Sequence, residues 1–287
     1  MVSLVPRTTA LAAAAFALSC DGGDDSANDC PGWNDATTIG TVQGDALDDP
    51  SGLVVSPLET DVLWSHNDAG DEPRLIAMSP SGDTLRKYLV SNVAMGDWED
   101  LAIAGSTLWI GDLGTDADSP PLLVGVPLPI VGPGDDDDGV LVPDDVLAVS
   151  YPDARPDVEA IFYDERSGQM VLVSRAKDGA STDVFTVDLS AGDAVPLTTL
   201  AFGHGALEGD GEVTGGTATA DRFALRTRSS AFVWERGTGD LDDAFESDPC
   251  PIAVDGTDGG EAIAFDGDDS VYLLGDGSHA PVVQTHE

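Results

Sequence analysis

Short apolar runs separated by turn residues dominate the chain from about residue 37 onward. The runs are four to seven residues long, rich in Val, Leu, Ile and aromatic residues, and bounded by Gly, Asp, Pro and Ser. Such runs are typical of β-strands joined by tight turns. No stretch beyond residue 37 has the 3.6-residue apolar periodicity of an amphipathic helix, so we predict an all-β domain without helices.

One hairpin pattern recurs five times. Each copy starts at an acid or a hydroxyl, continues through two apolar runs joined by a turn, and ends at a polar or charged group. The copies lie at 48–68, 97–112, 157–177, 212–228 and 259–276. A repeating unit of about 50 residues that contains short strands predicts a β-propeller.

The apolar runs group into about five blades of four strands, and the last blade is one strand short. The segment TTIGTVQ at 37–43 precedes the first blade and has no other role. Adding it as the outer strand of the last blade would close the ring and remove an exposed sheet edge. The alternative is six blades, with a degenerate one within 241–254.

Acidic residues far outnumber basic ones. The chain of 287 residues has 12 Lys and Arg against 53 Asp and Glu, a formal net charge of -41. Such a surface repels phosphate backbones, which excludes nucleic acid as a partner. Two interpretations of the acids stay open. They form a solvated surface suited to an exported protein, or a minority of them bind a cation. Four consecutive aspartates at 135–138 are typical of a solvated loop.

The N-terminus has the features of an export signal. Arg7 precedes an apolar run at 10–18 that is too short to span a bilayer and ends at Leu18-Ser19-Cys20. A cysteine after a small residue at this point resembles a bacterial lipoprotein cleavage site, and a conventional signal peptide is the alternative. We therefore expect a signal peptide at 1–19, an acidic lipoprotein tether at 20–36 lipidated on Cys20, and a propeller domain at 37–287.

The cysteine count supports export. The chain has three cysteines. If Cys20 carries lipid, Cys30 and Cys250 remain, and an oxidising compartment would let them form a disulfide. The spacing of the cysteines and histidines does not suggest a zinc site.

Candidate chemistry gathers where the first strand of each hairpin starts and the second one ends, because both points meet one mouth of a propeller. Glu99, Glu159 and Glu261 share one register, ahead of Leu-Ala-Ile or Ala-Ile. Carboxylates held close together cannot all stay ionised without compensation. A Ca²⁺ ion, with Asn67 and water as further ligands, would supply it. Cationic side chains are the alternative: Arg175, Lys177, Arg226 and Arg228.

Four aromatic or imidazole side chains lie near the same mouth. We expect Trp64 and Trp109 to pack between blades rather than to stack on a ligand. We expect His66 and His279 at the surface.

The ordered motifs resemble a group of secreted bacterial β-propeller proteins that is similar in pattern to TolB-like, gluconolactonase-like and phytase-like propellers. The resemblance covers about residues 50–275 and rests on the set WSHNDAGD, DWEDLAIAG, WIGDLG, YPDARPDVEAIFYDERSG, LVSRAK, VTGG, ALRTRS and GGEAIAF. It implies a calcium-stabilised propeller with acidic channel residues. The positions that match are Asn67, Asp68, Asp97, Glu99, Asp100, Asp112, Glu159 and Glu261. Where relatives have a lysine in the LVSRAK strand, this chain has Arg175.

Three hypotheses for function follow. The first is an exported, lipid-anchored, monomeric propeller of the bacterial envelope that binds Ca²⁺ in its channel, through Glu99, Glu159, Glu261, Asn67, Asp68 and Asp112, and a small-molecule or protein ligand at its mouth. The second is a metal-dependent hydrolase of phosphoesters or lactones, with Asp97 or Asp100 as general base and Arg175, Lys177 or Arg226 as anion stabiliser. The third is a purely structural pairing of glutamates with arginines. Fold alone does not choose among them.

Overall fold

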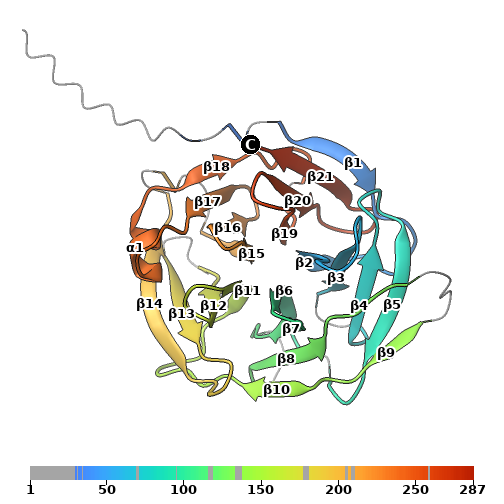
Figure 1. The fold of residues 1–287 in the computed structure, drawn as a ribbon, viewed down its shortest axis with the longest axis horizontal. Helices are drawn as coiled ribbons and strands as arrows, with labels where there is room; N and C mark the ends of the chain where they lie inside the picture. Colours follow the sequence, from blue (N-terminus) through green and yellow to red (C-terminus); the bar gives the residue numbers. More distant parts are fainter. Residues whose placement is uncertain are drawn as a thin grey trace, which may run out of the picture.

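The chain forms a closed ring of five β-sheets around a central axis (Figure 1). The computed structural model describes residues 30, 32–33, 35–68, 71–94, 96–115, 119–132, 138–176, 181–203, 206–207, 211–257 and 259–287. The expected signal peptide, the expected lipidation site Cys20 and most of the expected tether lie outside these residues. Among the described residues no helix is long and apolar enough to cross a membrane.

Each sheet is one blade, with its first strand at the axis. Blade one contains β2 (Pro50–Val55), β3 (Leu63–Asn67), β4 (Arg74–Met78), β5 (Thr84–Val90) and β9 (Gly139–Leu141). Blade two contains β6 (Trp98–Ala104), β7 (Thr107–Asp112), β8 (Leu122–Pro127) and β10 (Asp145–Ala148). Blade three contains β11 (Val158–Asp164), β12 (Gln169–Ser174), β13 (Ser181–Val187) and β14 (Ala194–Ala201). Blade four contains β15 (Val213–Ala218), β16 (Arg222–Thr227), β17 (Ala231–Glu235) and β18 (Cys250–Ile252). Blade five contains β19 (Ala262–Phe265), β20 (Ser270–Leu274), β21 (Pro281–His286) and β1 (Thr37–Thr41).

The predicted all-β class, the five blades and the closure by the N-terminal strand are confirmed. β1 pairs antiparallel with β21, so both ends of the chain build one blade. The segment 241–254, which the six-blade alternative needed, instead forms a short helix and β18, the outer strand of blade four. The ring therefore contains five blades rather than six.

The prediction that no helix follows residue 37 is wrong. Helix α1 (Leu241–Glu246) begins after Asp240, whose backbone N–H donates to the Asp243 carboxylate. Its apolar face, Leu241, Ala244 and Phe245, is buried, and the Phe245 ring lies 4.5 Å from the ring of Phe223. A helix of less than two turns gives too few repeats for a periodicity to be visible, so this element depends on tertiary packing.

Five apolar clusters, one between each pair of neighbouring blades, make up the core. Trp64 belongs to the cluster between blades one and two, and Trp109 to the cluster between blades two and three. Both indoles are buried, as expected for packing between blades. Trp33 completes the cluster between blades four and five, so the residues just before β1 belong to the folded domain rather than to the tether.

The Asp100 side chain joins the innermost strands of four blades. Its Oδ1 accepts the N–H of Leu101 at 2.8 Å, and its Oδ2 accepts the N–H of Ile161 at 2.8 Å and of Gly216 at 2.9 Å. The N–H of Leu53 also donates to this carboxylate. Leu53, Leu101, Ile161 and Gly216 lie in β2, β6, β11 and β15. A fully buried carboxylate with its acceptors engaged by backbone donors holds blades together, and we assign it this structural role rather than that of a general base.

Arg226 has the matching role between blades four and five. Its guanidinium is fully buried and donates to the carbonyls of Ala262 at 2.9 Å and Leu274 at 2.8 Å, and also to the carbonyl of Thr257. These bonds join β16 to the inner hairpin of the last blade. Arg226 therefore lies within the wall of the ring, and the structure does not place it where it could stabilise an anion at the mouth.

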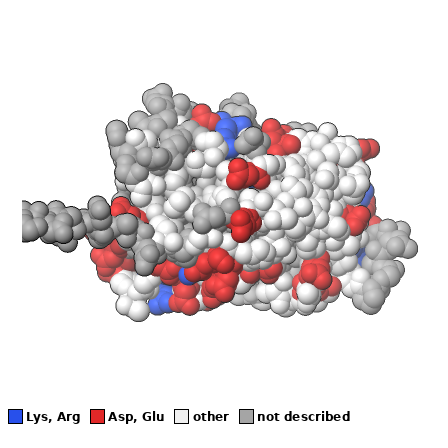
Figure 2. All heavy atoms as spheres, turned by 90° about the horizontal axis from the view of Figure 1, so that it is seen from above, with Lys and Arg blue, Asp and Glu red and all other residues white. Residues whose placement is uncertain are grey.

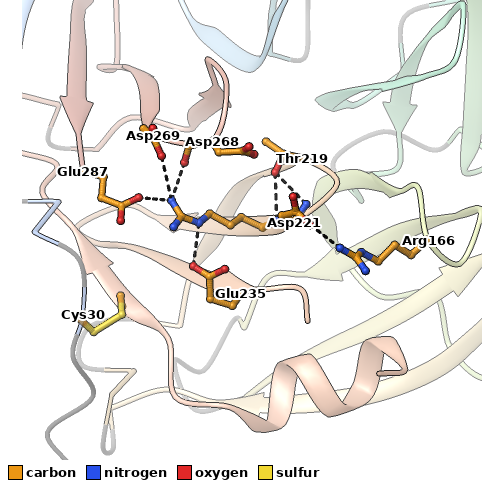
Figure 3. A network of polar contacts seen from close by, with 10 residues as sticks. Cys30, Arg166, Thr219, Asp221, Glu235, Asp268, Asp269 and Glu287 are labelled. Atoms are coloured by element: carbon orange, nitrogen blue, oxygen red, sulfur yellow. Dashed lines mark hydrogen bonds and ion pairs between the residues drawn. A yellow bond between two sulfur atoms is a disulfide. The ribbon is translucent and has the colours of Figure 1, made fainter. Parts of the chain in front are cut away.

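Further contacts close the ring between blades four and five. The guanidinium of Arg222 donates to the Glu235 carboxylate at 2.8 Å, to the carbonyl of Asp268 at 2.7 Å and to the carboxylate of Glu287 near the end of β21 (Figure 3). The predicted disulfide is present: Cys30 is bonded to Cys250 in β18, with 5.3 Å between the two Cα atoms. The N-terminal segment is thus attached to blade four by a covalent bond and to blade five by β1.

Acidic side chains are spread over the side of the ring drawn in Figure 2, with few basic groups among them. This distribution agrees with the excess of Asp and Glu in the sequence. Dispersed acids of this kind are typical of a solvated surface, whereas a cation site requires acids that lie close together.

Replacing Asp100 by Asn should destabilise the fold strongly. The amide NH₂ would face backbone N–H groups that now donate hydrogen bonds to the carboxylate. Buried donors would therefore lose their acceptor, at a cost of about 3 kcal/mol in the free energy of unfolding. Urea unfolding of the variant measures this loss. Asp145→Asn, at an exposed strand position, is the control and should change stability by less than about 0.5 kcal/mol. Equal stability of the two variants would contradict the role of Asp100 in joining the blades.

Candidate metal centre

Strand irregularities at one end of the innermost strands present two of the predicted glutamates, Glu99 and Glu159. Trp98 pairs with Asp112 and Asp100 pairs with Gly111, so Glu99 is an extra residue in β6. The corresponding extra residues are Gly52 in β2, Glu159 in β11 and Thr214 in β15. A β-bulge re-aims the side chain of its extra residue. The register that Glu99 and Glu159 share in the sequence is therefore a repeated bulge, whereas Glu261 directly precedes β19.

The three glutamates lie close enough for their charges to interact. The negative charges of four acids raise the pKa of Glu99; in order of strength they are Glu159, Asp68, Asp97 and Glu261. The charges of Asp68 and Glu159 in turn raise the pKa of Glu261. Side chains from blades one, two, three and five therefore meet at one mouth of the ring, as the shared register predicts.

Three of these acids form a tight cluster. One ligand oxygen each from Asp68, Asp97 and Glu99 lies within 4.8 Å of the others. Calcium–oxygen distances are about 2.3–2.6 Å, so two oxygens on opposite sides of an ion lie about 5 Å apart. Oxygens within 4.8 Å of one another can therefore all contact one ion. Asp97, for which the sequence suggested the role of a general base, belongs to this cluster.

Burial and neighbouring carboxylates raise the pKa of Glu99 far above its ordinary value, with burial as the larger cause. Its strongest charged neighbours are all acids. An ionised Glu99 would need a bound cation to stabilise it, and without one the carboxyl would keep a proton.

Glu159 and Glu261 differ from Glu99 because each contacts an arginine. Nη1 of Arg175 donates to Oε1 of Glu159 at 2.6 Å. Nη2 of Arg228 lies 3.2 Å from Oε1 of Glu261. Burial still raises the pKa of both glutamates, that of Glu261 to about 7, while the guanidinium groups oppose the rise. The mouth thus has an acidic half on blades one and two, where Asp68, Asp97 and Glu99 lie together, and a half on blades three to five, where arginines contact the glutamates.

Asn67 and Asp112, both predicted as metal ligands, hold loops beside the cluster. Oδ1 of Asn67 accepts the N–H groups of Asp48 at 2.9 Å and Asp49 at 3.2 Å. Oδ1 of Asp112 accepts the N–H of Asp97 at 2.7 Å. These bonds fix the backbone on either side of the cluster. Asn67 and Asp112 thus hold the backbone that presents the clustered acids.

Gly114 is a site residue that sequence reasoning missed. A Cβ atom at this position would overlap the carboxylates of Glu99 and Asp97, so only glycine leaves room for them. Arg155 donates to the Gly114 carbonyl, and Thr115 Oγ1 donates to Asp157 at 2.6 Å. The loop after β7 is thereby held against the cluster. The only signal for this role in the sequence was a glycine two residues after Asp112, which is equally typical of an ordinary turn.

His66 differs from its expected surface position, whereas His279 is exposed. The His66 imidazole is fully buried, and its Nδ1 lies 2.8 Å from the carbonyl oxygen of Asn67. Burial lowers its pKa to about 4, so the ring is neutral at pH 7. It packs edge-on to Trp98 with 5.7 Å between ring centroids and belongs to the core under the mouth. Lys177 lies outside the described residues, as do Asp135, Asp136 and Asp137 of the acidic run.

Comparisons with known proteins show the fold and no closer relationship. No model of a known protein family matches the sequence, and no curated protein matches it either. The PQQ-bound aldose sugar dehydrogenase from Streptomyces coelicolor is similar in structure, with a TM-score of 0.54 and 11% identity over 90% of this chain and 99% of that one. A glucose dehydrogenase is similar with a TM-score of 0.53 and 9% identity over 88% and 99% of the two chains. These likenesses, like the five sheets, define a β-propeller.

Removing Glu261 should change how stability depends on pH in the metal-free protein. The pKa of Glu261 is about 7 in the folded state against an ordinary 4.5, so the unfolded chain loses this proton first as the pH rises. Stability should therefore fall as the pH rises between these two values and level off above them. In Glu261→Gln the fall should be smaller by on the order of 2 kcal/mol, measured by urea unfolding with chelator present.

Glu165→Gln, which removes an exposed acid, is the control and should keep the wild-type pH profile. A profile for Glu261→Gln that overlays the wild type would show that this carboxyl titrates normally.

Proposed function

We propose that this protein is an exported, lipid-anchored β-propeller of the bacterial envelope that binds Ca²⁺ at the acidic half of its mouth and a further ligand beside it. The ligand atoms of Asp68, Asp97 and Glu99, within 4.8 Å of one another, carry the proposal. Anchoring through Cys20 rests on the sequence of the N-terminus, and the Cys30–Cys250 disulfide supports an oxidising compartment.

The donor set favours calcium over transition metals. All three side chains offer carboxylate oxygens, which suit hard cations, and the cluster contains no thiolate or imidazole. Calcium takes six to eight oxygens, so water or the second ligand would complete the shell. The positions of Gly114, Asn67 and Asp112 support the proposal because they hold the three acids in place before an ion arrives.

A second candidate function is a metal-dependent hydrolase of phosphoesters or lactones. It is favoured by Arg175 and Arg228, which lie in the same mouth as the carboxylates. A bound calcium would polarise the substrate oxygen, and a guanidinium would stabilise the anion that develops. No relationship to the two sugar dehydrogenases beyond the fold supports carrying their activity to this chain.

Calcium titration by isothermal calorimetry after chelator treatment tests the cation site. We expect one stoichiometric site whose affinity falls by at least about tenfold in Glu99→Gln, because a charged ligand is lost. Glu165→Gln on an exposed turn is the matched control and should bind like the wild type.

Weak binding to many sites, or equal affinities in the two variants, would show that the acids are a solvated surface. A tight site lost in Glu99→Gln would instead justify a screen of phosphoesters and lactones with and without calcium.

A further inference from the structure

The acidic insertion between β8 and β10 is fastened to a neighbouring blade. Glu59 of blade one accepts the N–H groups of Val131 at 2.7 Å and Gly132 at 3.1 Å. Tyr88 Oη in β5 donates to the carbonyl of Ile130 at 2.9 Å. The chain then returns as β9, which pairs parallel with β5. The insertion thus leaves blade two, adds a fifth strand to blade one, and goes back to blade two as β10.

The outer edge of β9 is open. In the part of the chain that the structure describes, β9 ends the sheet of blade one, and no strand pairs with its other side. It is drawn at the rim of the ring, outside β5 (Figure 1). The Leu141 carbonyl accepts the N–H of Ser91 at 2.8 Å, so this residue faces β5. Because hydrogen-bonding directions alternate along a strand, the N–H and C=O of Val140 face outward.

Gly139 fits this placement closely. A Cβ atom there would overlap the ring of Tyr88, so glycine lets β9 lie directly on the tyrosine. β9 therefore packs closely on blade one as the fifth strand of its sheet.

Apolar side chains are exposed along this edge. Val140 is 63% exposed, Val142 is 56% exposed, and Leu89, paired with Val140, is 39% exposed. An open strand edge with exposed valines is a template for pairing with another strand. Extended peptides bind such edges through main-chain hydrogen bonds and are selected by alternate side chains.

The charges around β9 indicate which kind of segment would bind there. Asp138, Asp144 and Asp145 are exposed beside it, and Asp138 ends the run of four aspartates. Two basic residues of β5 lie at the insertion as well: Lys87 is 3.7 Å from Asp138, and Arg86 donates to the Val131 carbonyl at 3.2 Å. A second copy of this chain would bring the same acids to the contact and another net charge of -41. Charge complementarity instead favours a basic segment.

We propose that the open edge of β9 binds an extended segment of a protein partner in which apolar residues alternate with Lys or Arg. The segment would add a strand to blade one, place its apolar side chains against Val140 and Val142, and direct its basic side chains to Asp138, Asp144 and Asp145. This surface is independent of the proposed calcium site.

The test uses a capped eight-residue peptide of alternating valine and lysine, labelled for fluorescence anisotropy, with the purified protein at physiological salt. We expect saturable binding that weakens about tenfold in Val140→Pro, which removes an outward N–H, and in Val140→Lys, which removes the apolar contact. Val195→Lys replaces a similarly exposed valine in β14 of blade three and should leave binding unchanged. Thermal unfolding checks that all variants fold.

Three results would overturn the proposal. The first is equal binding of the peptide to Val140→Lys and to the wild type. The second is equal binding of a lysine–glycine peptide of the same charge, which would show attraction by charge alone. The third is a dimer in sedimentation that Val140→Pro dissociates, which would identify a second copy as the occupant.

Discussion

One buried carboxylate determines how the blades of this propeller meet. Asp100 accepts backbone N–H groups from β2, β6, β11 and β15, so the innermost strands of four blades converge on a single side chain. Burial raises the pKa of this group, and the four donors oppose the rise by favouring its ionised form. Asp100 directly follows the bulge residue Glu99. The bonds that hold the ring together therefore also fix the place where the acidic side chain leaves the strand.

The mouth above Asp100 is divided by its charge. Asp68, Asp97 and Glu99 form a cluster that suits a calcium ion, whereas Glu159 and Glu261 contact Arg175 and Arg228. The arginine pairing drawn from the sequence thus describes Glu159 and Glu261, and the cation site stays a proposal for the other three acids. Acids at equivalent positions in different blades can be neutralised in different ways, because each blade contributes its own loops and its own second strand.

The ends of the chain and the insertion show how a small propeller manages its strand edges. β1 and the Cys30–Cys250 bond attach the N-terminal segment to blades five and four, and Arg222 holds Glu287 at the other end of the chain. β9 covers the edge of β5 and becomes the outer strand of blade one. The outer strands β1, β10, β14 and β18 also end their sheets, and β9 differs from them because it comes from the insertion of another blade.

The sequence by itself determined the strands, the five hairpin repeats, the closure by 37–43 and the common register of Glu99, Glu159 and Glu261. It predicted the pairing of Cys30 with Cys250 on the condition that Cys20 carries lipid, and it left six blades open as an alternative. These follow from local alternation, from repetition and from the small number of cysteines. Only the tertiary structure decided that Asp97 joins the cluster, that Asp100 and Arg226 lie inside the ring, that Gly114 makes room for Glu99, and that 130–132 and 139–141 contact blade one. Neighbouring acids on one strand look alike in sequence, and whether each meets a backbone donor, an arginine or another acid depends on residues that other blades bring to it.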